Sequence, residues 1–248
     1  MATQTNRTTA PRRRRARGSI SSEEILKGAF ALCEADGVDG LSMPRLAQHL
    51  GVGVTSIYWY FKSKEELLDA LTEEGFRRFY GQMPALEGRA WDDVLREFFS
   101  NFRSILRQDD VLCDLTIMRG SSYGDDTISL TWSRIEEILE VLVKAGFSEA
   151  SASYAYFTLS IYTRGSLMVE RRVRSQGVVE EAPHPRAHLA SMMPVMSQEV
   201  ERHSWYMVSD DDFDFGIENN IRGLRTLLTA DRKAAKSAAA KSTAKQGS

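Results

Sequence analysis

The sequence predicts an all-α fold, with an N-terminal three-helix helix-turn-helix domain and a C-terminal helical bundle. Apolar residues recur at helical spacing, no stretch alternates apolar and polar residues, and short Gly-, Pro- or Asp-rich breaks separate the helical stretches. We expect four parts: a disordered Arg-rich arm, the helix-turn-helix domain, a second helical domain, and a disordered basic tail. Their residues are 1–19, 20–66, 67–230 and 231–248.

Three short helices are predicted at the start of the folded region. Ser21 and Glu24 have the spacing of a capping box, so a helix begins there. Ser42 begins a second helix, which Gly51 ends at a tight turn. The third helix, 54–61, is too short to form alone and must be held by the other two.

This order of helices is typical of a motif that places one helix end in the DNA major groove. In the third helix, Ile57 and Phe61 share one face and are expected in the core, which leaves hydroxyl and aromatic side chains outside. The alternative is that Tyr58 or Trp59 packs on the fourth helix. The candidate DNA contacts are Arg45, Gly53, Val54, Thr55, Ser56, Tyr58, Trp59, Tyr60, Lys62 and Lys64, with Arg12, Arg13, Arg14 and Arg15 of the arm.

Two nearby segments, LSMPRLAQHLGV and YWYFKSKEELLDAL, carry a family resemblance. Through them, residues 22–72 resemble the TetR family of transcriptional repressors, and most closely its tetracycline-repressor branch. Weaker similarity continues through LREFFSNFR, AGFSEA and FDFGIENNIRGLRTLL. The resemblance implies a homodimer that binds palindromic operator DNA and is released by a small-molecule effector. Pro44 stands where that branch carries a base-reading arginine, so the operator sequence does not carry over.

The net charge of −2 hides an uneven distribution. Residues 1–19 carry +6 and residues 231–248 carry +4, which leaves −12 for the rest of the chain. Both ends are rich in Ala, Ser and Thr and are expected to be disordered. An Arg-rich arm before a helix-turn-helix can enter the minor groove, as homeodomain arms do. The alternative is that the two ends only improve solubility.

Composition indicates a cytoplasmic globular protein. No stretch approaches the roughly 20 apolar residues of a membrane span, and no apolar run follows the N-terminal charges as in a signal peptide. Cys33 and Cys113 lie in different predicted domains and are expected to be small core residues. Three histidines lack a nearby Cys or a suitably spaced carboxylate, so no metal site is expected; they are His184, His188 and His203.

The second part of the chain contains aromatic residues on predicted helices, which suit either a filled core or a cavity between helices. The helices are expected at 64–81, 91–107, 110–120, 127–145, 148–172, 187–204 and 212–229. Arg119 and Arg164 have apolar neighbours and need an anionic partner, which is either Glu170 or Glu140 or a ligand carboxylate.

The resemblance implies a ligand site in this domain. Tyr80, Phe98 and Phe102 fall where the tetracycline branch contacts its drug, and Thr116 falls where that branch has its magnesium-binding histidine. Only Phe102 keeps the branch's residue type. The site is therefore expected to be apolar and free of metal and of any other cofactor. The full set of expected ligand contacts is Tyr80, Phe98, Phe102, Thr116, Arg119, Ile135, Ile138 and Tyr162.

The resemblance also implies that helices 148–172 and 212–229 form a four-helix interface with a second copy. An apolar stripe on the last helix suits this interface: Phe213, Phe215, Ile217, Ile221, Leu224 and Leu228. Two other functions are considered. A nucleoid-type protein would use both basic ends with low sequence specificity. An enzyme would need a nucleophile or an acid/base pair, and the sequence shows no such motif.

Overall fold

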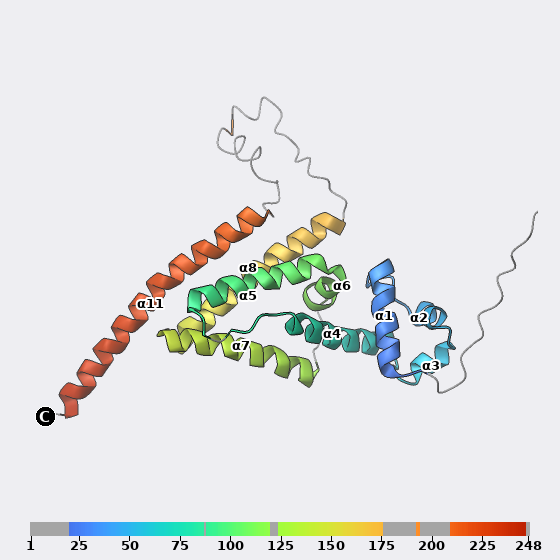
Figure 1. Cartoon of the computed structure of the whole chain (residues 1–248), viewed down its shortest axis with the longest axis horizontal. Helices are drawn as coiled ribbons and strands as arrows, with labels where there is room; N and C mark the ends of the chain where they lie inside the picture. Colours follow the sequence, from blue (N-terminus) through green and yellow to red (C-terminus); the bar gives the residue numbers. More distant parts are fainter. Residues whose placement is uncertain (1–19, 87, 120–123, 176–191, 194–208, 247–248) are drawn as a thin grey trace, which may run out of the picture. The chain divides into compact units, whose positions relative to one another are not determined.

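The computed structural model describes residues 20–86, 88–119, 124–175, 192–193 and 209–246 (Figure 1). The described residues are helical or lie in turns, and no strand occurs among them, which confirms the all-α prediction. They divide into two compact units, Met1–Glu74 and Gly75–Ser248. The unit boundary falls inside helix α4 (Lys64–Gly81), whose predicted bounds of 64–81 are confirmed.

The first unit contains α1 (Ser22–Asp36), α2 (Met43–Leu50) and α3 (Val54–Tyr58). The predicted capping box is present, because Ser21 Oγ accepts from the Glu24 amide at 3.1 Å and Glu24 Oε2 accepts from the Ser21 amide at 3.0 Å. Gly51 ends α2 with φ +68°, a left-handed conformation that favours glycine.

The third helix is shorter than the predicted 54–61, but its core residues are as expected. Ile57 and Phe61 are both buried. The amide of Phe61 still donates to the Ile57 carbonyl at 3.0 Å, so the chain makes one further turn beyond α3. α3 packs against α2 and is held by it, as a helix of five residues requires.

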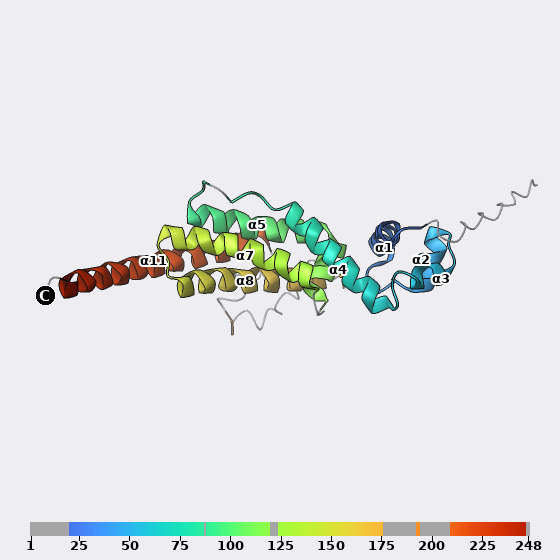
Figure 2. The same cartoon turned by 90° about the horizontal axis from the view of Figure 1, so that it is seen from below.

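The second unit contains α5 (Trp91–Gln108), α6 (Asp110–Cys113), α7 (Asp125–Ala145), α8 (Glu149–Ser175) and α11 (Asp210–Gln246). Figure 2 shows α5, α7 and α8 side by side, and α11 packs on α5 and α8. A short π-helical segment, η1 (Asp114–Met118), replaces the second half of the predicted helix 110–120. The predicted helix 187–204 lies outside the described residues, apart from 192 and 193.

The C-terminal tail was expected to be disordered from residue 231, and this was wrong for residues 231–246, which continue α11. Alanine and lysine have high helix propensity, so this composition extends a helix that has already formed. The tail is also anchored where it leaves the bundle. Asp231 accepts from the Ser148 amide at 2.8 Å, and Arg232 donates to the Ala145 carbonyl at 2.6 Å.

Candidate functional site

The outer face of α3 and the turn after it expose aromatic side chains. Trp59 is 78% exposed, Tyr58 is 43% exposed, and Val54 and Thr55 are also exposed. The alternative in which Tyr58 or Trp59 is buried against the fourth helix is not observed within this unit. These exposed groups are of the kinds that contact phosphates and thymine methyl groups. Ser56 and Gly53 are partly exposed on the same short segment.

Tyr60 lies on this surface but has a structural contact as well. Its hydroxyl donates to the Ile20 carbonyl at 2.6 Å, which ties the end of residues 54–61, hereafter the reading segment, to the chain just before α1. Its partner is 40 residues away in the sequence, so local spacing gave no signal of this contact. The Tyr60 hydroxyl is thus engaged inside the protein, although the residue as a whole remains exposed.

Arg45, a predicted DNA contact, forms its hydrogen bonds with residues of the same unit. Its guanidinium donates to Asp36 Oδ2 at 2.6 Å and to the Gly40 carbonyl at 2.8 Å. Its charge is therefore compensated, and the side chain closes the turn between α1 and α2. Gly40 is required there, because a Cβ would lie 2.6 Å from the Asp36 carbonyl oxygen.

The turn between the reading segment and α4 is fixed by hydrogen bonds. The Lys62 amide donates to Glu66 Oε2 at 2.6 Å, and Ser63 Oγ accepts from the Glu66 amide at 3.1 Å. The Lys62 side chain is exposed and the Lys64 side chain is partly exposed. Residues 20–74 contain only four Lys or Arg against ten Asp or Glu. The predicted arm arginines, Arg12–Arg15, lie outside the described residues.

In the second unit, the residues predicted to line a ligand site form a packed aromatic cluster. Tyr80, Phe98 and Phe102 are buried; the Phe102 ring lies 4.8 Å from that of Phe79 and 6.3 Å from that of Phe98. Burial also raises the pKa of the nearby Tyr156 hydroxyl above its ordinary value. Further expected contacts are buried as well: Thr116, Ile135 and Ile138.

Two predicted ligand contacts have their hydrogen bonds satisfied by the protein. Thr116 Oγ1 donates to the Leu112 carbonyl at 2.7 Å. Tyr162 Oη donates to the carbonyls of Asp212 and Phe213 at 3.0 and 3.2 Å. A Cβ on Gly216 would lie 2.0 Å from the Tyr162 hydroxyl, so glycine is needed for this close approach. Tyr162 therefore joins α8 to α11 through its hydroxyl, and its role as a ligand contact stays a prediction.

Glu170 and Glu140, the protein partners expected for Arg119 or Arg164, pair with other cations. Glu170 pairs with Arg103 at 2.7 Å, and Arg103 also bonds Asp210 at 2.8 Å. Glu140 pairs with Lys144. The interior arginine is Arg103, which sequence reasoning missed although it lies one helical turn after the buried Phe99. Arg164 is partly exposed, with Nε 3.3 Å from Ser160 Oγ and its guanidinium 5.4 Å from the Phe102 ring centre; Arg119 is also partly exposed.

The stripe predicted for dimerisation is mostly covered by the chain itself. Phe213, Ile217, Ile221 and Leu228 are buried within the single chain, Leu224 is partly buried, and only Phe215 is largely exposed. An apolar stripe does not reveal which element covers it, whether a helix of the same chain or of a second copy. A different exposed apolar stripe runs along α8 at helical spacing: Tyr154, Phe157, Ile161 and Met168.

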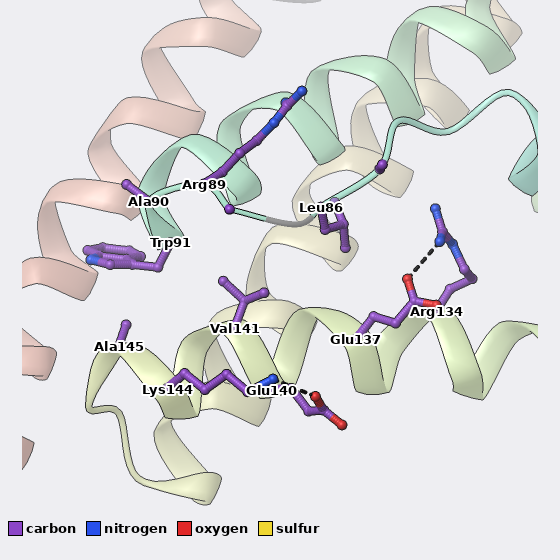
Figure 3. A pocket seen from close by; sticks show the side chains of 12 residues that line it. Leu86, Arg89, Ala90, Trp91, Arg134, Glu137, Glu140, Val141, Lys144 and Ala145 are labelled. Carbon is purple, nitrogen blue, oxygen red and sulfur yellow. Dashed lines mark hydrogen bonds and ion pairs between the residues drawn. The ribbon is translucent and has the colours of Figure 1, made fainter.

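A cavity of about 760 Å³ lies between α7 and the connection from α4 to α5 (Figure 3). None of the predicted ligand contacts lines it. A second cavity of about 480 Å³ lies between α7 and the first turn of α8. The first cavity is lined by Ala85, Leu86, Gly88, Arg89, Ala90, Trp91, Arg134, Glu137, Glu140, Val141, Lys144 and Ala145.

Within the described part of the chain, no three His, Cys, Asp or Glu side chains gather as a metal site would require. The three histidines considered for metal binding lie outside it. Cys33 and Cys113 are buried and unpaired with each other, and burial raises the pKa of the Cys113 thiol to about 11. This thiol is therefore protonated at neutral pH. No helix in the described ranges has the length and apolarity needed to cross a membrane.

Comparison with known proteins identifies both parts of the chain. Residues 25–71 match the family described as bacterial regulatory proteins, tetR family, and residues 83–228 match the tetracyclin repressor-like C-terminal domain. An HTH-type transcriptional repressor of Mycobacterium tuberculosis is 34% identical over 92% of this chain and 89% of its own length. The class D tetracycline repressor of Escherichia coli is 29% identical over 85% of this chain and 92% of its own length.

Solved structures share the fold. Apo ActR from Streptomyces coelicolor has a TM-score of 0.64 at 21% identity and covers 87% of this chain and 99% of its own. TetR from Acinetobacter baumannii has a TM-score of 0.61 at 24% identity and covers 84% of this chain and 98% of its own. With the exposed reading helix and the helical second unit, these matches lead to one conclusion: the chain belongs to the TetR family of bacterial transcriptional regulators, with an N-terminal helix-turn-helix DNA-binding domain and a C-terminal domain of the tetracycline-repressor type.

Proposed function

We propose that this protein is a homodimeric, cytoplasmic repressor that binds a palindromic operator and is released from it by a small molecule. The observation that carries the proposal is the exposed face of α3, with Tyr58, Trp59 and Thr55 open to a partner on a helix-turn-helix domain. Large aromatic groups exposed together on so small an element favour a binding surface. The M. tuberculosis relative is itself named a transcriptional repressor, which supports the direction of regulation.

The proposed dimer uses the exposed stripe of α8, together with Phe215, which is exposed on α11. Tyr154 and Ile161 are each 72% exposed, and Phe157 lies between them along the helix. A continuous apolar face of this kind is stabilised by a second copy of itself around a two-fold axis. This set replaces the buried stripe of α11 as the dimer contact.

The proposed effector is a mostly apolar small molecule bound in the C-terminal domain without metal. Related structures support a small-molecule ligand there: an A. baumannii TetR variant was solved with minocycline, and ActR was solved with actinorhodin. The absence of metal is inferred from the donor set, because Thr116 replaces a histidine and its hydroxyl already donates to Leu112. Magnesium requires several oxygen ligands.

The test is a selection from random duplex DNA with the full-length protein. We expect a two-fold symmetric site whose half-sites lie about 10 base pairs apart, or a multiple of that spacing. Trp59→Ala should abolish the enrichment. Glu34→Ala, an exposed substitution on α1, serves as the control and should leave it intact. The alternative, a nucleoid-type protein, predicts no enriched sequence and a specificity ratio near one at moderate salt.

A further inference from the structure

We propose that the 760 Å³ cavity between α7 and the α4–α5 connection binds a neutral, mostly apolar small molecule that carries a hydrogen-bond-accepting oxygen. Its size falls in the range of small-molecule sites in proteins. The aromatic cluster around Phe98 and Phe102 is a separate region, because neither residue lines the cavity.

The lining of the cavity combines apolar and charged side chains, and its apolar part comes from the α4–α5 connection, the first residue of α5 and α7. In Figure 3, Leu86 of the connection and Val141 of α7 face the same space, with Trp91 and Ala145 toward one end. Trp91 is held in place by an edge-to-face contact with Phe147, whose ring centre lies 5.0 Å away. A ligand body of aliphatic or aromatic groups is therefore matched to these walls.

The charges on the lining favour a neutral ligand. Arg134 Nη1 bonds Glu137 Oε2 at 2.6 Å, and Lys144 Nζ bonds Glu140 Oε2 at 2.8 Å. Arg89 also forms an ion pair with a carboxylate of α5. Each cation of the lining is thus matched by a carboxylate. An ionic ligand would have to displace one of these partners or leave its own charge uncompensated on entering the cavity.

Arg134 provides the polar anchor. Its Nη2 donates to the Pro84 carbonyl over a long 3.4 Å contact, and its buried Nε has no hydrogen-bond partner among the described residues. A guanidinium in this state has donor capacity that the protein does not use. A ligand carbonyl or hydroxyl at this end of the cavity would give Arg134 a better acceptor than Pro84, once the side chain turns toward it.

Two fluorescent probes test the site on the full chain without DNA. Nile red is neutral and carries a ring carbonyl, whereas 1-anilinonaphthalene-8-sulfonate is an anion of similar apolar character. We expect Nile red to bind more tightly than the anion. Arg134→Met keeps the length and the apolar stem but removes the donors, and it should weaken Nile red binding about tenfold, the effect of losing one hydrogen bond to a charged group.

The decisive experiment fills the cavity with a larger side chain. Val141→Phe should abolish Nile red binding, whereas Ile128→Phe, at an exposed position of the same helix outside the cavity, should not change it. If Val141→Phe fails to fold by circular dichroism, Ala145→Leu fills the same space. Unchanged Nile red affinity in a folded filling variant overturns the proposal, as does tighter binding of the anion. Loss of binding on Phe102→Trp, with Val141→Phe unaffected, would place the site in the aromatic cluster instead. Because no DNA is present, these results do not depend on the proposed repressor function.

Discussion

At the scale of single residues, neighbouring side chains of the reading segment have different tasks. Tyr58 and Tyr60 are two positions apart and equally exposed, yet the Tyr60 hydroxyl donates to the Ile20 carbonyl at 2.6 Å. The Tyr60 hydroxyl thus contributes to the helix-turn-helix unit, and we expect Tyr58 to be the DNA contact of the two. Side-chain exposure alone does not separate these two roles; the hydrogen bond does.

Tyr58→Ala should weaken binding to the selected operator by about 1 kcal/mol or somewhat more, because one phosphate or base contact is lost. Its melting temperature should stay near that of the parent protein. Tyr60→Phe is the comparison: it removes only a hydroxyl and should lower the free energy of unfolding by about 1 kcal/mol. Fluorescence anisotropy and chemical denaturation measure the two effects. A Tyr58→Ala variant as unstable as Tyr60→Phe would show that Tyr58 is structural.

The residues that were predicted correctly depend on near neighbours in the chain. The capping pair Ser21 and Glu24 is three residues apart, and Gly51 follows the helix that it ends. The contacts that sequence reasoning missed join residues far apart in the chain. Glu170 lies 67 positions from Arg103, and Tyr162 lies 50 positions from Asp212. No periodicity in one sequence reveals pairs of this kind, because they form only when helices pack.

At the scale of elements, α11 also shows that a sequence pattern does not reveal which distant element a helix packs against. Its amphipathic pattern was recognised, but its apolar face covers α5 and α8 of the same chain. Its first turn is fixed by ion pairs, since Asp210 bonds Arg103 and Arg107 of α5. The hydrogen bond from Arg103 holds the pKa of the Asp210 carboxyl below its ordinary value.

Asp210→Asn should therefore destabilise the protein at neutral pH. A carboxyl group with a lowered pKa in the folded state stabilises the fold above its ordinary pKa of about 4 and loses this contribution as the pH falls through the folded value. The loss at pH 7 should not exceed about 1 kcal/mol, because Asp210 is largely exposed and solvent screens the pair.

Urea denaturation at several pH values measures this effect. Asp211→Asn makes the same charge change at the same helix end, at an exposed position, and serves as the matched control. The difference between the two variants should be present at pH 7 and shrink toward zero below about pH 4. A difference that persists unchanged in acid would show that the Asp210 contact is not electrostatic.

At the scale of the whole molecule, the helix-turn-helix unit carries net negative charge, which by itself would repel the phosphates of DNA. The segment 20–74 is acidic, whereas the six arginines of residues 1–19 have no acidic neighbour. We therefore expect phosphate attraction to come largely from residues 1–19 and from a few exposed side chains of the helix-turn-helix unit. Composition predicted this division, whereas the helical state of residues 231–246 was missed.

Removing residues 1–17 should weaken operator binding and reduce the slope of log affinity against log salt. Up to about six cations would no longer release counterions, and each contributes close to one unit of slope. The slope is measured by anisotropy over a range of salt concentrations. An arm in which all six arginines are replaced by glutamine controls for chain length and should behave like the truncation. A slope equal to that of the full chain would show that the arm does not contact DNA.

The proposed dimer gives a second prediction at this scale. Ile161→Glu places a charge in the exposed stripe of α8 and should convert the dimer to a monomer in analytical ultracentrifugation. Operator affinity should fall with it, since a monomer reads one half-site. Ile128→Glu makes the same change at an exposed position of α7 and should remain dimeric. A dimeric Ile161→Glu protein would place the interface elsewhere.

In a ligand-released repressor, binding of the effector and binding of the operator DNA must weaken each other. A screen without DNA for small molecules that raise the melting temperature of the protein supplies a ligand. Such a ligand has not been selected for its ability to release the protein from DNA. The decisive measurement is the affinity of that ligand with and without saturating operator. Linkage requires that operator weaken ligand binding by the same factor by which ligand weakens operator binding, and we predict a weakening of at least about fivefold, the low end of typical coupling. Equal ligand affinities in the two conditions would contradict a ligand-released repressor.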